Sequence, residues 1–368
     1  VFRDVTNVVE AVYVYPDYNG KDWETIKENY HSKIEAGLET EAFYQEMKAM
    51  IFELGDEHSN FLSPVEVEAE AVELKGENNY VGVGIYGNYD FEKNSFVVIS
   101  TFPGSSAEYA GIQSHDSILQ VDGLPITEEL GNRLRGPECS AVLAKVQSPG
   151  EAPRDVMLMR YRIQGSIPIE ARLVSTTDGS KIGYIFIPTF FDETIPPQIE
   201  AALNEFGQLD GLILDLRLNG GGSSTVTYPI LEFFTDGKLG QFVSRKRSRA
   251  LEIEANPIQN SQTVPLIIMV GEDTVSFGEI FAGVMQDSER AKIVGETTLG
   301  NVEVLSGYDF DDGSVIWIAA ETFKSAFSDA NWEQTGIVPD AQAFAPWDTF
   351  YFDTDPSIKA AVELLGHQ

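Results

Sequence analysis

Residues 211–222 read GLILDLRLNGGG, an apolar run that ends in Asn219 and three glycines. A short apolar run bounded by glycine is typical of a buried β-strand. The runs KIGYIFIPTF and PLIIMVG, on either side of it in the sequence, have the same character, and the helical run PPQIEAALNEFG separates the first two. Strands that alternate with helices predict a layered α/β fold for residues 166–368.

Two further regions precede this core. Residues 1–70 are expected to be helical, because WETIKENYHSKIEAG and EAFYQEMKAMIFELG carry apolar residues at roughly helical spacing. Residues 71–165 contain short strand-like runs, such as FVVISTF, SILQVDGLPI and DVMLMRYRI, separated by turn residues. These runs predict a β-rich domain of ordinary size.

The composition limits the classes of partner. The chain has 368 residues, with 25 Lys and Arg against 58 Asp and Glu, and a formal net charge of -33. This charge repels nucleic acid and anionic membranes, so we expect neither as a partner. No apolar run approaches the ~20 residues that span a bilayer, which predicts no integral membrane segment. Because the chain starts at Val1, we expect a processed or trimmed N-terminus.

Ser276 lies in the stretch GEDTVSFGEIFAGVMQD, residues 271–287, and has two interpretations from the residues alone. Serine is a favoured N-cap, and Glu279 three residues later completes a capping box that is worth ~1 kcal/mol. The same position exposes a hydroxyl at a helix N-terminus, where backbone N–H groups can hold an oxyanion. The triplet Gly220-Gly221-Gly222 also has two interpretations. It forms a tight turn, or its lack of side chains lets a backbone N–H approach a substrate carbonyl.

Several motifs, in order along nearly the whole chain, resemble the carboxyl-terminal processing serine peptidases, also called tail-specific proteases, and their tricorn-like relatives. They are LGDEHSNFLSP, YVGVGI, PGSSAEYAGIQSHDSILQVDG, LRGPECSAVLAKVQSPGE, GLILDLRLNGGG, VGEDTVSFGEIFAGVMQDSERAKIVGETTLG and GIVPD, the last of which resembles the closing strand. The resemblance implies a helical N-terminal region (1–70), an inserted PDZ domain (71–165) and a crotonase/ClpP-like α/β peptidase core (166–368). It implies a serine endopeptidase acting on protein or peptide substrates without a metal or organic cofactor.

The resemblance also assigns a nucleophile, and the sequence departs from it at the base. Ser276 falls on the nucleophile, and Gly221 with the N–H of Phe277 on the oxyanion hole. The lysine that many relatives use as base falls on Asn301, and their supporting glutamine falls on Leu305. Asparagine has no basic nitrogen, so it cannot take the serine proton.

The tricorn-like branch uses histidine and glutamate instead, which points to His58 as base and Glu333 as the carboxylate that orients it. Ser59 and Asn301 are expected to line this site. The alternatives are a structural role for His58 and a solvated loop position for Glu333. The remaining histidines and two lysines match no base position of the family: His31, His115, His367, Lys292 and Lys324.

The PDZ resemblance implies a peptide-binding role. Its Tyr80-Val81-Gly82-Val83 run is expected to offer backbone N–H groups to a terminal carboxylate, and an edge for strand addition. Arg160 resembles an arginine that links the PDZ domain to the active site in some relatives.

Two other function classes remain open at this point. The lost lysine is also compatible with a catalytically inactive pseudopeptidase that acts as a PDZ binding and scaffold protein. Another crotonase-like enzyme, acting on acyl thioesters, is disfavoured by the PDZ insertion. Family resemblance implies an extracytoplasmic location, in the periplasm, the cell envelope or secreted. The sequence does not define the oligomeric state or the substrate.

Overall fold

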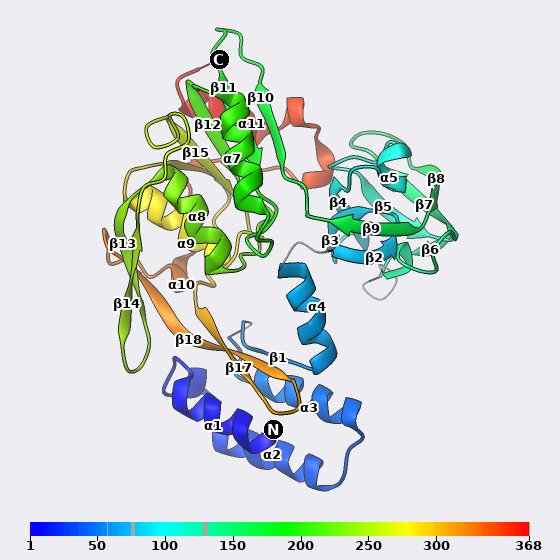
Figure 1. The fold of residues 1–368 in the computed structure, drawn as a ribbon, viewed down its shortest axis with the longest axis vertical. Helices are drawn as coiled ribbons and strands as arrows, with labels where there is room; N and C mark the ends of the chain where they lie inside the picture. The colour runs from blue at the N-terminus through cyan, green and yellow to red at the C-terminus, as the bar shows by residue number, and fades with distance from the viewer. Residues whose placement is uncertain (57, 75–77, 128–131, 368) are drawn as a thin grey trace.

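The computed structural model describes residues 1–56, 58–74, 78–127 and 132–367 (Figure 1). The core is a six-stranded sheet in the order β10-β11-β12-β15-β16-β19, parallel except for β10. Its strands are β10 (Glu170–Val174), β11 (Ile182–Phe186), β12 (Gly211–Asp215), β15 (Leu266–Val270), β16 (Lys292–Gly295) and β19 (Ala341–Gln342).

Both faces of this sheet are covered by helices, which explains why its strands are apolar throughout. Along β12 the side chains alternate: Leu212 and Leu214 pack against one group of helices and Ile213 against another. The first face carries α7 (Ile195–Phe206), α8 (Ser224–Phe234) and α9 (Phe277–Asp287), and the second carries α11 (Pro356–Leu364). Because β12 and β15 are parallel neighbours, the glycine turn after β12 and the Ser276 loop after β15 meet at one edge.

A second sheet joins the core to the N-terminal helices. Its strands are β1 (Asn60–Leu62), β13 (Gly237–Val243), β14 (Ser248–Ile253), β17 (Val304–Asp309) and the long β18 (Val315–Ser325). One end of β18 pairs with β1 and the other with β13, so this strand runs between the two regions (Figure 1). The helices packed against it are α1 (Phe2–Val12), α2 (Trp23–Glu35) and α3 (Thr40–Phe52).

The region between helices and core is β-rich, as expected. It begins after α4 (Pro64–Leu74), which extends four residues past the expected end of the helical region. Its main sheet has the order β3-β4-β5-β7-β8, with β6 on β5, and β2 pairs separately with β9. The elements are β2 (Asn78–Gly82), β3 (Ile85–Asp90), β4 (Ser95–Thr101), α5 (Ser106–Tyr109), β5 (Ser117–Val121), β6 (Leu124–Pro125), β7 (Ala141–Gln147), β8 (Arg154–Met159) and β9 (Tyr161–Gly165).

The α/β fold with a β-rich insertion is confirmed, and two local expectations were wrong. DVMLMRYRI is not one strand, because the chain leaves the sheet at Arg160 between β8 and β9. The GIVPD run is not the closing strand, because β19 begins at Ala341, just after it. Pro339 within the run has no N–H to donate to a neighbouring strand. None of the described helices is long and apolar enough to cross a membrane.

Candidate active site

Ser276 occupies a strained corner between β15 and α9. Its backbone has φ 57° and ψ -123°, a left-handed conformation that is costly for any residue other than glycine. It is the N-cap of α9, and the predicted capping box with Glu279 is present. The side chain is partly exposed, so the corner presents a hydroxyl at the start of a buried helix.

Glu279 organises the backbone around Ser276. Its side chain is fully buried, and it accepts hydrogen bonds from the N–H groups of Ser276 (3.2 Å), Gly300 (2.7 Å) and Asn301 (2.8 Å). The Thr298 hydroxyl donates to the same carboxylate. The N–H of Ser276 also donates to the carbonyl oxygen of Asn301 at 3.0 Å. One carboxylate therefore ties the serine corner to the segment that follows β16.

The structure brings the proposed oxyanion-hole residues to Ser276. A Cβ atom on Gly221 would lie 2.8 Å from Cβ of Ser276 and 3.2 Å from the backbone nitrogen of Phe277, so only glycine fits there. The N–H of Gly221 donates to Oδ1 of Asn219 at 2.9 Å, and it becomes available to a substrate only when this bond opens. The sequence interpretation missed Asn219, which is fully buried and also donates to the carbonyl of Ile187.

His58 is held in a loop that docks on β18. Asp56 accepts the N–H of His58 at 3.1 Å and both the N–H and the hydroxyl of Ser59. The Ser59 hydroxyl in turn accepts the N–H of Ala319 at 3.0 Å, so it anchors the loop. Burial lowers the pKa of His58, against the opposing charges of Glu303 and Asp56. The imidazole is therefore neutral near pH 7, the form a general base requires.

Ser276 and His58 lie on either side of one short segment. Asn301 contacts Ser276 through its carbonyl oxygen, and Oε2 of Glu303 lies 3.9 Å from Nδ1 of His58. Two residues of extended chain span at most about 7 Å. Among the described residues no hydrogen bond joins the Ser276 hydroxyl to the imidazole. The Asn301 side chain is buried, and its Oδ1 has no hydrogen-bond partner in the described part of the chain.

Glu333 lies near this group but does not contact His58 in the predicted way. It belongs to the short helix α10 (Trp332–Thr335), and its Oε2 accepts the N–H of Val302 at 2.8 Å. Burial, and then the adjacent Glu303 carboxylate, raise the pKa of Glu333 to about 8. No ion pair or hydrogen bond links Glu333 to His58 within the described ranges. Glu303 was not predicted, because an acid just before a strand gives no signal of burial.

The other histidines and lysines lie away from Ser276. His31 is exposed on α2, and His367 pairs with Asp178 near the C-terminus. Nδ1 of His115 donates to the carbonyl oxygen of Trp347, 2.7 Å away, and the imidazole stacks on the Trp347 ring. The side chains of two lysines are exposed on β16 and β18: Lys292 and Lys324.

In the PDZ-like region the expected peptide-binding run, residues 80–83, is not a free strand edge, and the strand after it, β3, is. Tyr80 pairs with Ile163 of β9, and the carbonyl of Val81 accepts the N–H of Gly136, so both sides of the run are occupied. The same holds for its remaining residues: Gly82 forms a bridge to Arg135, and the carbonyl of Val83 accepts the N–H of Ala107. Of the two outer strands of the main sheet, β3 pairs with β4 and β8 with β7, so β3 is the edge strand that follows this run in the chain.

Arg160 does not reach the active site. It is buried, and its guanidinium donates to Ser140, Ala141 and the carbonyl of Arg133, all within the PDZ-like region.

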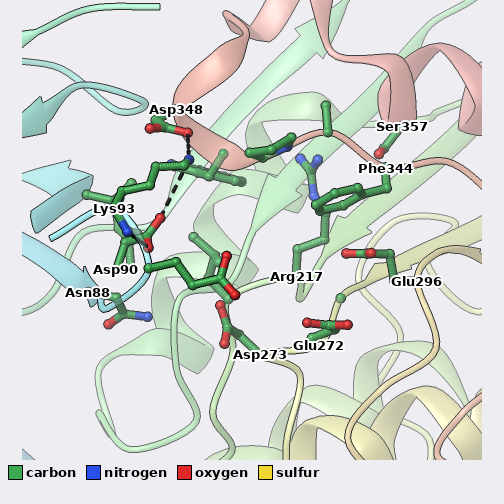
Figure 2. A pocket seen from close by; sticks show the side chains of 18 of the residues that line it. Asn88, Asp90, Lys93, Arg217, Glu272, Asp273, Glu296, Phe344, Asp348 and Ser357 are labelled. Carbon is green, nitrogen blue, oxygen red and sulfur yellow. Dashed lines mark hydrogen bonds and ion pairs between the residues drawn. The ribbon is translucent and has the colours of Figure 1, made fainter. Parts of the chain in front are cut away.

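A cavity of about 450 Å³ lies between the PDZ-like region and the core (Figure 2). Lys93 of the β3–β4 hairpin forms an ion pair across this junction with Asp348, at 2.5 Å. On the core side, the buried Arg217 pairs with Asp215 and Asp355, each at 2.6 Å. Arg217 is two residues before Asn219, so the junction continues directly into the glycine turn of the active site.

Comparison with known proteins agrees with this organisation. The model of peptidase family S41 matches residues 181–343, the PDZ domain model matches 71–129, and the tricorn protease C1 domain model matches 1–51. Together with the serine corner, these matches define a serine-type peptidase with a PDZ domain. Within that class, residues 181–343 match peptidase family S41, and most of the chain is similar to proteases named carboxyl-terminal processing.

Relatives are similar over most of their length. The carboxyl-terminal-processing protease of Synechocystis sp. is 29% identical over 369 residues, which cover 97% of this chain and 84% of that protein. The chloroplastic carboxyl-terminal-processing peptidase 3 of Arabidopsis thaliana is 29% identical over 355 residues, covering 91% and 67%. Among solved structures, the photosystem II D1 C-terminal processing protease superposes with a TM-score of 0.64 at 25% identity, covering 98% and 96%.

Proposed function

We propose that this peptidase hydrolyses peptide bonds with Ser276 as nucleophile and His58 as general base, and without a Ser-Lys dyad. The observation that carries the proposal is the segment Asn301–Glu303, which contacts Ser276 at one end and faces His58 at the other. A neutral imidazole accepts the serine proton during attack and returns it to the leaving amine.

The oxyanion that forms in this attack needs donors at the start of α9. The N–H of Phe277 lies there, and the Gly221 N–H joins it once the bond to Asn219 opens. Glu279 keeps the Ser276 backbone in place without touching the substrate. No step of this scheme uses a metal or an organic cofactor.

We further propose that the PDZ domain captures the C-terminal tail of a protein substrate by strand addition to β3, an edge strand of its main sheet. A substrate that ends in a free carboxylate should then be cleaved with a lower KM than the same peptide with an amidated terminus. Equal KM values for the two peptides would remove tail capture from the proposal.

An extracytoplasmic location is part of the same proposal and rests on the family resemblance. Relatives named as chloroplastic support a location in a compartment other than the cytoplasm. Fractionation of the native source with an antibody against the chain tests this placement.

A fluorophosphonate probe tests the nucleophile and base, because only an activated serine reacts rapidly with it. The wild-type chain should be labelled, Ser276→Ala should not, and His58→Gln should react at least ~10³-fold more slowly. Peptide mapping should place the label on Ser276. Absence of labelling in a folded wild-type chain would instead indicate an inactive PDZ-binding protein.

A further inference from the structure

Two buried polar atoms face each other beside the active site. Nδ1 of His58 and Oε2 of Glu303 are 3.9 Å apart, and neither has a hydrogen-bond partner among the described residues. The side chains are 15% and 2% exposed, so water does not readily satisfy them. Buried polar atoms without partners are rare in folded proteins and call for an explanation.

We propose that Glu303, rather than Glu333, is the carboxylate that positions His58, and that Glu333 acts only through Glu303. This inference rests on the proposed role of His58 as base. Glu303 is a positioning residue, since it faces the imidazole and not the substrate.

The Glu303 carboxylate is fixed from the side opposite His58. Its Oε1 accepts the hydroxyl of Tyr15 at 2.7 Å, from the chain that follows α1. Glu303 also directly precedes β17, which pairs with β18, the strand on which the His58 loop docks. Tyr15 and the sheet therefore aim the second oxygen, Oε2, at His58.

Glu333 keeps the charge of this acidic pair on Glu303. Burial and the neighbouring Glu303 raise the pKa of Glu333, because ionising two adjacent carboxylates is unfavourable. Glu333 therefore carries a proton at neutral pH. A protonated carboxyl is a donor, and a side-chain hydrogen bond between Glu333 and Glu303 contributes to the raised pKa of Glu333. The pair holds one negative charge, placed next to the imidazole.

The chemical consequence is a fixed tautomer. With Nδ1–H directed at Glu303, the Nε2 lone pair is free to accept the Ser276 proton. A separation of 3.9 Å is about 1 Å longer than a hydrogen bond, and such contacts commonly tighten when the imidazolium forms. Besides Glu303, the Asp56 carboxylate also raises the pKa of His58, and Tyr13 and Tyr15 lie beside these two acids. The pocket on which His58 opens is lined by four further ionisable residues from the N-terminal region: Lys21, Tyr30, Lys48 and Glu53.

The test measures the titration of His58 directly, in the Ser276→Ala background, where no hydrolysis is needed. The imidazole resonances of the four histidines are followed by NMR, and His58→Gln identifies the His58 signal. Glu303→Gln removes a charge that stabilises the imidazolium, so the pKa of His58 should fall further. Glu333→Gln mimics the protonated acid and should leave it nearly unchanged.

With Ser276 intact, Glu303→Gln and Glu333→Gln should differ in their effect on the rate of peptide hydrolysis. Glu303→Gln should lower kcat/KM ~10²-fold, mostly in kcat, and Glu333→Gln less than about threefold. Glu170→Gln, on β10 of the other sheet, is the matched control and should change neither quantity. If Glu303→Gln does not fold, Glu303→Asp serves as the test. It keeps the negative charge but moves the carboxylate away from His58, so kcat/KM should fall about tenfold and the His58 pKa should fall less than in Glu303→Gln.

Two outcomes overturn the inference. One is a His58 pKa that responds to Glu333→Gln and not to Glu303→Gln. The other is an unchanged kcat and His58 pKa in Glu303→Asp. A failure of the proposed function looks different: His58→Gln would then retain activity, whatever the titration of His58 shows.

Discussion

The backbone N–H of Ser276 donates to the carbonyl oxygen of Asn301 at 3.0 Å, so the position expected to match the lysine of Ser-Lys relatives lies directly against the proposed nucleophile. The Asn301 side chain is 7% exposed. Its own N–H is bound by Glu279, and Glu303 follows two residues later. Buried carboxylates therefore lie on both sides of the Asn301 position, Glu279 on its own N–H and Glu303 two residues later.

We expect Asn301→Lys not to create a working Ser-Lys dyad. Carboxylates close to an ammonium favour its charged form, and a protonated lysine cannot accept the serine proton. Measured as kcat/KM from pH 6 to 10, Asn301→Lys should lose about tenfold or more, while Asn301→Ala should stay within about threefold. A double variant with His58→Gln that regains activity at alkaline pH would show that lysine does serve as base here.

The glycine turn offers a matched pair of substitutions. Gly221 has φ +90° and no space for a Cβ, whereas a Cβ on Gly220 would have no atom within 4 Å. Gly221→Ala should therefore displace the turn from Ser276 and lower kcat ~10²-fold, in the range for loss of one oxyanion donor. Gly220→Ala should leave kcat nearly unchanged. Equal effects of the two variants on peptide hydrolysis would rule out a role for the Gly221 position.

Glu279→Ala should destabilise the fold as well as the active site. It would leave the N–H groups of Gly300 and Asn301 and the Thr298 hydroxyl without their acceptor, and the N–H of Ser276 would keep only the Asn301 carbonyl. Breaking such a buried charged network typically costs about 3–5 kcal/mol, which urea unfolding measures. Glu205→Ala, at an exposed position of α7, is the control and should change stability by less than about 0.5 kcal/mol. A variant with wild-type stability would mean that water replaces the lost carboxylate.

Much of the fold follows from local patterns in the sequence. The buried run at 211–215 predicted β12, because a strand covered on both faces is apolar at every position. Helices α2 and α3 followed from apolar spacing alone. The pairing of β18 with both β1 and β13 could not be predicted, because each pairing joins segments far apart in the sequence: Phe61 lies opposite Ile316, and Phe242 lies opposite Phe323.

The site was predictable only in part, for a physical reason. Ser276 and the glycine turn carry local signals, a cap and a triplet without side chains. The burial of Glu303 and the raised pKa of Glu333 depend on which chains fold over them, and nothing in the neighbouring residues encodes that. The predicted roles of His58 and Glu333 remain predictions until the variants above are measured.

Acid should destabilise the junction between the PDZ domain and the core through His115. Burial lowers the pKa of His115 to about 4, against 6.5 for an unfolded histidine. Between these values the unfolded chain binds more protons, so stability falls as pH falls. The loss from pH 7.5 to 5 should be about 2 kcal/mol by urea unfolding. His115→Gln should lack this component, and His31→Gln, an exposed change on α2, should keep it. The same pH slope in His115→Gln would assign the effect to other groups.

The pH dependence of hydrolysis should report His58. Because burial lowers the pKa of His58 below 6.5, kcat/KM should rise through an acid limb centred below that value and stay level above about pH 7. Below its pKa the imidazole is protonated and cannot accept the Ser276 proton. Rates are measured from pH 5 to 9, with circular dichroism at each pH to exclude unfolding through His115. The limb should persist in His31→Gln, and His58→Gln should have too little activity to show one. A profile that instead climbs steadily to pH 9 would indicate a base other than histidine, and would place the nucleophile's activation outside the His58 loop.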